Sequence, residues 1–112
     1  MSFAIIFHDL DVAVAGTDDV LHWLAWNIPA KAGGIPEGSL PEGAVAGTAG
    51  VGRGSYFGPG APAGPRYHHY VCELFALSAM LDVHADATRA QLFDAMKDIT
   101  VGKAAYVGRF RQ

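Results

Sequence analysis

The segment from residue 29 to residue 65 constrains the fold more than any other stretch of this chain. It holds all six prolines and eleven of the fourteen glycines, with only four charged side chains. Proline lacks a backbone N–H, and glycine loses the most conformational freedom on folding, so the segment predicts neither a helix nor a long strand. It is also too long for a simple connection, which is typical of functional loops. The regular elements must therefore come from the residues on either side of it.

Apolar side chains are nevertheless spread through this segment, which predicts that it lies against a sheet. They are Ile35, Leu40, Val45, Val51, Tyr56 and Phe57. Its glycine-rich part, residues 47–60, does not follow the GxxxxGK[ST] spacing of a phosphate-binding loop and contains no lysine. The glycines are better explained by a backbone that runs close to a ligand or to a neighbouring strand.

The flanking residues have the patterns of strands. Residues 3–7 form a short apolar run that predicts a strand, and residues 103–110 predict a last strand or an extended tail. Residues 20–28 are apolar at both sets of alternate positions, which indicates a strand buried on both faces. Strict alternation in that strand places His22 on the same face as Leu24 and Trp26.

Residues 67–77 predict another strand, whose two faces differ. One face is apolar except at its first position and carries His68, Tyr70, Cys72, Leu74 and Ala76. The opposite face is mixed, and its Glu73 needs water or a partner. The apolar face is therefore expected to be the dry one. A histidine at its entry end would lie at the rim of the core, where small-molecule pockets form.

One helix is predicted after this strand, in the region of residues 88–98. Thr88 followed three residues later by Gln91 matches a capping box, and Asp86 is an alternative N-cap. An apolar stripe at helical spacing consists of Leu92, Phe93 and Met96. The stripe indicates packing against the core and not a cofactor site.

Composition indicates one globular domain, residues 1–112, with the Gly/Pro-rich loop region 29–65 inside it. The formal net charge of −3 provides no basic surface of the kind that binds nucleic acid or anionic membranes. The first eleven residues lack the cationic start and the apolar length of a signal peptide, and no stretch is long enough to span a bilayer. These features predict a cytoplasmic protein without membrane insertion. The lone Cys72 predicts a reduced, buried and inert thiol.

Polar side chains stand at the ends of the predicted strands. Asp9 and Asp11 follow the first strand, where aspartates cap turns, orient a histidine or hold a cation. His22 is either a core histidine bonded to the backbone or a pocket residue. The pattern alone leaves both interpretations open for these residues. His8 and His84 have no neighbouring pattern that separates them from surface histidines.

Taken in order, the chain has a strand ending in DxD, an apolar strand containing HW, a loop ending in GPGAPAGPRYHHY, a further strand, a TRAQLFDAMK helix and a terminal VGRF. This order resembles the phosphatidylethanolamine-binding protein family, also called Raf-kinase-inhibitor-like, in its short bacterial branch. The resemblance covers nearly the whole chain. It implies a mainly β fold, a β-sandwich with one C-terminal helix. Family members carry further strands before the DxD strand, so the resemblance also implies an N-terminally truncated fold.

The resemblance implies an anion pocket at the mouth of the sandwich. We expect no cofactor, no metal and no catalytic residue there. The ligand-binding residues that the resemblance carries across are Asp9, Asp11, His22, Gly58, Pro59, Pro62, His68 and Tyr70. The implied ligand is a small phosphate- or carboxylate-bearing molecule. Leu10 and Ala13 replace family prolines around the two aspartates, and His69 stands where the family often has arginine. The loss of a permanent bidentate cation should weaken phosphate binding and make it pH-dependent.

Other functions stay open on the sequence. An aspartate that orients a histidine also suits a small acid–base enzyme such as an isomerase, dehydratase or hydrolase. A metal site formed by His22, His68, His69 and an aspartate has little support, since the two adjacent histidines point to opposite strand faces. Regulation of a partner protein through residues 29–65 is a third possibility, although nothing in the sequence of this segment identifies the partner. Because missing strands would leave an apolar face and a free strand edge, we also predict a homodimer.

Overall fold

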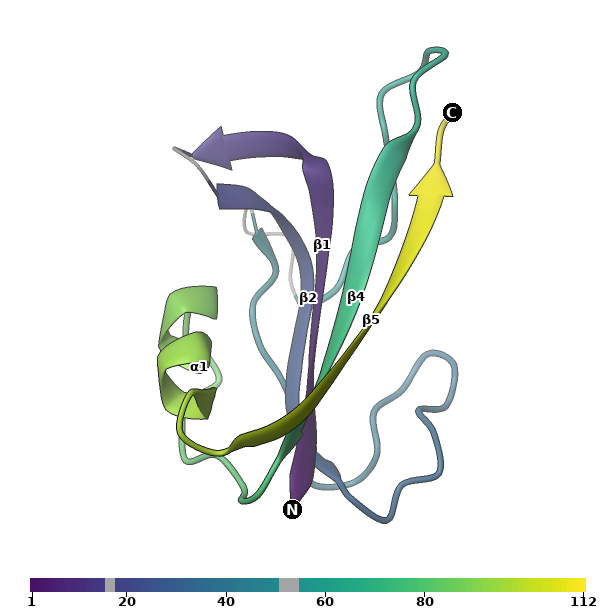
Figure 1. Cartoon of the computed structure of the whole chain (residues 1–112). Helices are drawn as coiled ribbons and strands as arrows, with labels where there is room; N and C mark the ends of the chain where they lie inside the picture. The colour runs from purple at the N-terminus through teal and green to yellow at the C-terminus, as the bar shows by residue number, and fades with distance from the viewer. Residues whose placement is uncertain (16–17, 51–54) are drawn as a thin grey trace.

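A computed structural model describes residues 1–15, 18–50 and 55–112, which form a five-stranded antiparallel sheet with one short helix (Figure 1). The strand order across the sheet is β3-β2-β1-β4-β5. The elements are β1 (Ser2–Ala15), β2 (Asp18–Pro29), β3 (Val45–Ala46), β4 (His68–Leu77), α1 (Arg89–Met96) and β5 (Thr100–Phe110). The predicted mainly β fold is confirmed. The first strand is longer than predicted because it continues through the two aspartates.

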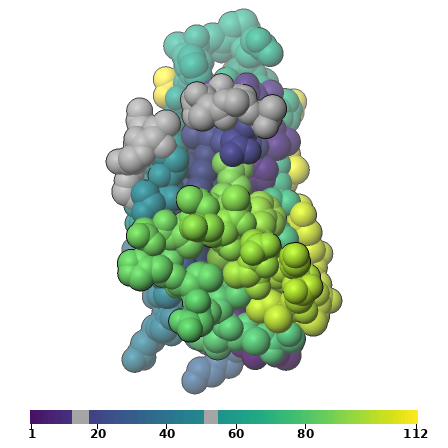
Figure 2. All heavy atoms as spheres, turned by 90° about the vertical axis from the view of Figure 1, so that its left-hand side faces the viewer, coloured from purple at the N-terminus to yellow at the C-terminus, as the bar shows by residue number. Residues whose placement is uncertain are grey.

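Helix α1 and the segments beside it cover one face of the sheet (Figures 1 and 2). The predicted capping box is formed, since the Thr88 and Gln91 side chains each accept the other's backbone N–H. The larger core cluster lies under the helix and consists of Ala4, Ile6, Leu21, Leu24, Trp26, Phe75, Leu77, Leu81, Ala87, Leu92 and Met96. No helix in the described residues is long and apolar enough to cross a membrane.

The opposite face of the sheet is covered by the Gly/Pro-rich segment, as its apolar content predicts. Ile5, Ala25 and Ile28 form a second buried cluster. The loop side chains packed against it are Ala32, Ile35, Leu40 and Ala44. Further along, Tyr56 makes an isolated bridge to Trp23 of β2. Val51, which was expected to lie on the sheet as well, is outside the described residues.

An irregularity in the pairing of β1 with β2 turns His22 away from the helix. Phe7 and His8 are consecutive in β1, yet their partners in β2 are two residues apart, Trp23 and Leu21. His22 is the extra residue of this β-bulge, and bulges re-aim side chains next to sites. Its ring contacts Phe7 on the face opposite the helix. The alternation that grouped His22 with the buried side chains under the helix is therefore wrong.

From Cys72 to Leu77 the two faces of β4 are the reverse of the prediction, whereas Tyr70, on the face predicted to be dry, is buried. Phe75 and Leu77, on the mixed face, are buried because α1 covers them. On the face expected to be dry, Leu74 is 38% exposed. Cys72 is only partly buried there, and this burial raises the pKa of its thiol, which keeps it protonated at neutral pH.

Prediction failed for His8, which is no surface histidine. Its Nδ1 lies 2.5 Å from Asp19 Oδ2, and its Nε2 lies 3.1 Å from Glu73 Oε2. Asp19 also pairs with Arg89 at the start of α1, and Glu73 pairs with Lys103 of β5 at 2.8 Å. On the helix side of the sheet, these charged side chains therefore pair with one another and form an ionic network next to the apolar core. This network links the helix to β1, β2, β4 and β5.

Strand β5 forms one edge of the sheet and is exposed along nearly its whole length. Its exposed apolar side chains include Val101, Tyr106 and Val107, with exposed fractions of 63%, 78% and 53%. Only its β4 side is hydrogen-bonded in the described chain. An edge of this length without proline is a site where another strand can pair.

Gly47 tests the packing of the loop against the core. A methyl group added there would meet the Trp26 ring at 2.8 Å, closer than real contacts allow. Because the ring is fully buried, Gly47→Ala is expected to lower the free energy of unfolding by about 1–3 kcal/mol, as measured by chemical denaturation. Gly34→Ala is the matched control, since nothing lies within 4 Å of its added methyl. Equal stability of the two variants would contradict this packing.

Candidate functional site

Two pockets share a wall at one end of the sheet. The inner pocket has a volume of about 270 Å³ and is lined by Asp9, Val12, Val20, His22, Phe57, Gly58, Gly60, Ala61, Pro62, His68 and Tyr70. The outer pocket, about 360 Å³, is lined by Asp11, Val12, Pro62, Ala63, Gly64, Pro65, Arg66, Tyr67 and His68. Val12, Pro62 and His68 belong to both. The two pockets therefore adjoin.

Asp9 is the buried carboxylate of the inner pocket, with 4% exposure. Its Oδ1 accepts the backbone N–H of Asp11 at 2.9 Å, and its Oδ2 lies 2.8 Å from Nδ1 of His68. Because a carboxylate accepts, the His68 proton is on Nδ1, and Nε2 is left for a ligand. Asp9 thus orients a histidine, one of the roles that the sequence left open, and it accepts a backbone N–H within the strand and not at a turn.

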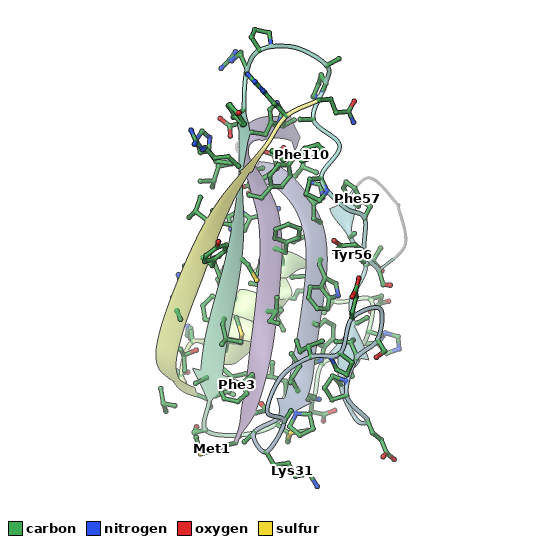
Figure 3. The ribbon with its side chains drawn as sticks, turned by 90° about the vertical axis from the view of Figure 1, so that its right-hand side faces the viewer. Met1, Phe3, Lys31, Tyr56, Phe57 and Phe110 are labelled. Atoms are coloured by element: carbon green, nitrogen blue, oxygen red, sulfur yellow. The ribbon has the colours of Figure 1, made fainter. Side chains whose placement is uncertain are left out.

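The bulge residue His22 is fastened to the loop that closes the pocket. It is 3% exposed, and its Nδ1 lies 2.8 Å from the carbonyl oxygen of Phe57. A carbonyl can only accept, so Nδ1 donates and Nε2 is the nitrogen available to the pocket. The Phe57 N–H donates in return to the His22 carbonyl at 3.3 Å, and the two rings lie 4.1 Å apart. Figure 3 shows Phe57 at the same end of the sheet as Phe110.

Tyr70 completes the floor of the inner pocket. Its ring meets the His22 ring edge-on, with the centroids 5.3 Å apart, and it is 4% exposed. Burial raises the pKa of the Tyr70 phenol above its usual 10.0, and the nearby Asp9 charge adds to the effect. The hydroxyl therefore keeps its proton at neutral pH, and a hydrogen bond to the Asp9 side chain contributes to this.

Asp11 lies at the outer pocket and pairs with the second histidine. Its Oδ2 accepts the backbone N–H of His69 and lies 2.9 Å from the His69 Nδ1. The backbone N–H is the main reason that the pKa of Asp11 is lowered, and the His69 side chain adds to it, so this carboxylate stays ionised at neutral pH. The two consecutive histidines thus have an aspartate each, on opposite faces of β4. His69 faces Asp11 and not the inner pocket.

Most of the sequence-predicted ligand residues meet at the inner pocket. They are Asp9, His22, Gly58, Pro62, His68 and Tyr70. Asp11 lines only the outer pocket, and Pro59 lines neither. Their roles in binding stay predictions. Sequence reasoning missed Phe57, whose only signal was an aromatic pair in a glycine-rich loop.

The described residues offer no group of three or more His, Cys, Asp or Glu side chains that could hold a metal ion. The side chains in the inner pocket that could ligate a metal are two histidines and one aspartate. Oδ2 of Asp9 and Nδ1 of His68 are already hydrogen-bonded to each other. The arrangement suits hydrogen bonding to a ligand better than metal coordination.

Comparison with known proteins gives a consistent picture. The family model described as phosphatidylethanolamine-binding protein matches residues 1–111. A UPF0098 protein of Methanothermobacter thermautotrophicus is 34% identical over 81% of this chain and 62% of its own length. A UPF0098 protein of Pyrococcus horikoshii is 36% identical over 99% of this chain and 58% of its own length. A Mycobacterium tuberculosis candidate lipoprotein, LppC, is 35% identical over 96% of this chain and 52% of its own.

Solved structures agree in fold. The crystal structure of Escherichia coli YbcL, described as a new member of the mammalian PEBP family, superposes with a TM-score of 0.85 at 25% identity over 99% of this chain and 71% of YbcL. The CT736 homologue from Chlamydia trachomatis gives 0.88 at 26% identity over 99% of this chain and 72% of CT736. The chain spans about half to two-thirds of the length of the curated relatives named above. It belongs to the phosphatidylethanolamine-binding protein family.

Proposed function

We propose that this chain is a small-molecule anion-binding module whose inner pocket holds a phosphate- or carboxylate-bearing ligand. One observation carries the proposal: in both pocket histidines Nδ1 is engaged by an acceptor, so Nε2 is the free nitrogen. The protonated Tyr70 hydroxyl is a third group at the same pocket. Membership of the phosphatidylethanolamine-binding protein family supports the same ligand class.

The Nδ1 bonds also determine where an added proton goes. The Phe57 carbonyl accepts from His22, and Asp9 accepts from His68. Nδ1 of each histidine therefore carries a proton in both the neutral and the cationic form of the ring. Protonation therefore occurs at Nε2, on the pocket side, and adds both a donor and a positive charge. Asp9 in an anion site is not contradictory, because its Oδ2 is directed at Nδ1 of His68 and away from the nitrogen left for the ligand.

Reversible binding is favoured over covalent catalysis by the composition of the inner pocket. The Asp9–His68 pair would suit a general base, which is why an acid–base enzyme was an alternative. The described lining contains no serine, threonine, cysteine or lysine that could act as a nucleophile.

We also propose a cytoplasmic location, which subcellular fractionation of the full-length natural protein tests.

We further propose that two copies associate through the exposed strand β5. Its free edge and its exposed Val101, Tyr106 and Val107 support this, since an unprotected apolar edge strand pairs readily with another strand.

Substitution of His68 tests the anion pocket. His68→Asn keeps a side-chain amide toward Asp9 but removes Nε2, so phosphate affinity is expected to fall by about tenfold or more. Histidine NMR signals, titrated with inorganic phosphate, give the affinity and report whether His22 responds in the wild type. His84→Asn, at an exposed histidine paired with Asp86, is the matched control. A His68→Asn variant that binds phosphate as well as wild type would rule the pocket out.

The raised pKa of Tyr70 predicts a late-titrating tyrosine. The folded state favours the neutral phenol, so its contribution to stability is complete below 10.0 and is lost as pH rises through the folded-state value. In an ultraviolet titration of tyrosinate, one of the four tyrosines should therefore ionise after the rest. Tyr70→Phe should remove this last step, whereas Tyr106→Phe, at a 78% exposed residue, should leave it in place. Four indistinguishable titrations would contradict the burial of Tyr70.

Self-association is tested by a charge on β5. Val107→Lys places a cation on the exposed strand and is expected to shift the protein toward monomer in analytical ultracentrifugation. Lys31→Gln, on the loop at the other end of the sheet, should leave the mass unchanged (Figure 3). A wild-type protein that stays monomeric at high concentration would sink the proposal.

A further inference from the structure

Three arginines gather beside the outer pocket, and the proposed function makes no use of them. Arg66 lines the pocket itself. Arg109 and Arg111 come from the end of β5 and the residues after it, which the β4–β5 pairing brings beside the start of β4. Figure 1 shows the C-terminus next to the loop that precedes β4. Residues 45 positions apart in sequence thus form one rim.

Tyr67 holds two of these arginines in place. The Arg109 guanidinium carbon lies 4.9 Å from the centre of the Tyr67 ring, and that of Arg111 lies 4.6 Å from it. Arg111 also donates from Nη1 to the Pro65 carbonyl at 3.3 Å. Stacking on an aromatic ring leaves the N–H groups of a guanidinium free to bind an anion. Because the same tyrosine lines the outer pocket, the rim is attached to the pocket wall.

These three cations differ from most others in the described chain. Arg89, Lys97 and Lys103 each have a carboxylate partner within 4.0 Å. No carboxylate pairs with the three rim arginines among the described residues. The chain as a whole carries a formal charge of −3, so three unpaired cations at one place are a local excess. Such an excess attracts an anion from outside.

Two aspartates lie near the rim. Asp11 lies in the outer pocket and stays ionised, but both N–H groups of His69 are directed at its Oδ2. Asp9 is buried at the inner pocket and bonded to His68. The main-chain oxygen of Gln112 also lies here, where it accepts the Gly64 N–H at 3.2 Å. The three arginines outnumber the one aspartate side chain that lines the outer pocket.

Pocket size points to a ligand that spans both pockets. Ligand sites usually have volumes of about 300–1,000 Å³. The inner pocket alone, at about 270 Å³, falls just below this range, whereas the two adjoining pockets together fall well inside it. His68 belongs to both linings and connects them.

We propose that the outer pocket with Arg66, Arg109 and Arg111 is a second anion subsite, and that the ligand carries two anionic groups joined by a short spacer. This inference rests on the proposed function, because the first anionic group occupies the inner pocket. Arg66 and the two arginines on Tyr67 bind the second. The ligand class is thus a small bisphosphate or a phosphate–carboxylate, and not a simple monophosphate.

The experiment compares propyl phosphate with a series of alkanediol bisphosphates of increasing spacer length. Affinities come from calorimetry, and the His68 NMR signal reports the inner pocket. At the best spacer, the bisphosphate should bind wild type at least about tenfold more tightly than propyl phosphate. In Arg66→Gln/Arg111→Gln this advantage should disappear, while propyl phosphate binds as before. Tyr67→Leu, which removes the stacking ring, should reduce the advantage in part.

A matched variant separates the rim from net charge. Lys31→Gln/Lys97→Gln also removes two positive charges, but at positions away from the pockets; Figure 3 shows Lys31 at the opposite end of the sheet. The tighter binding of the bisphosphate should persist in this variant. An equal loss in this variant would overturn the inference. A bisphosphate that binds no more tightly than propyl phosphate would also overturn it and leave the proposed function standing. Failure of both ligands to move the His68 signal would instead remove the proposed function and the inference together.

Discussion

The pairing of β1 with β4 is the constraint on which the site depends. It runs without a register shift from Ser2 opposite Leu77 to Asp9 opposite Tyr70, although these strands are separated by more than fifty residues in the chain. A slip of one residue would turn every side chain of a strand to the other face. The unbroken register therefore brings Asp9 to His68, and the Asp9–His68 contact is a consequence of backbone geometry before it is a matter of side-chain chemistry.

Pairing of β1 with β2 follows the opposite principle. Its register shifts several times, and the shift at His22 supplies the second pocket histidine. The site thus combines a rigid wall, where β1 and β4 meet, with a wall shaped by an irregular strand and by the Phe57 segment fastened to it. The helix takes no part in the pocket, and its core lies on the other face of the sheet.

The sequence was sufficient for the four longer strands, the capped helix and the loop laid on the sheet, and it named most of the polar side chains that line the inner pocket. The spacing of apolar residues and the capping box depend only on residues close together in the chain, and the motifs of the family occur in a fixed order. These features can therefore be recognised without coordinates. The bulge could not be predicted, because a strand that is apolar on both faces gives no sign of where its alternation breaks. The ionic network of His8 was missed for a related reason: Asp19 and Glu73 reach it only through two different strand pairings.

The bulge at His22 has a consequence for how this fold can diverge. A single inserted residue shifts the alternation of side chains between the pocket end of β2 and its core end. The side chains at the two ends therefore contact different neighbours. Leu24 and Trp26 belong to the core under the helix, whereas His22 packs on aromatic rings of the pocket end. Substitutions at the two ends of β2 therefore act first on different sets of side chains, one in the helix-side core and one around the pocket.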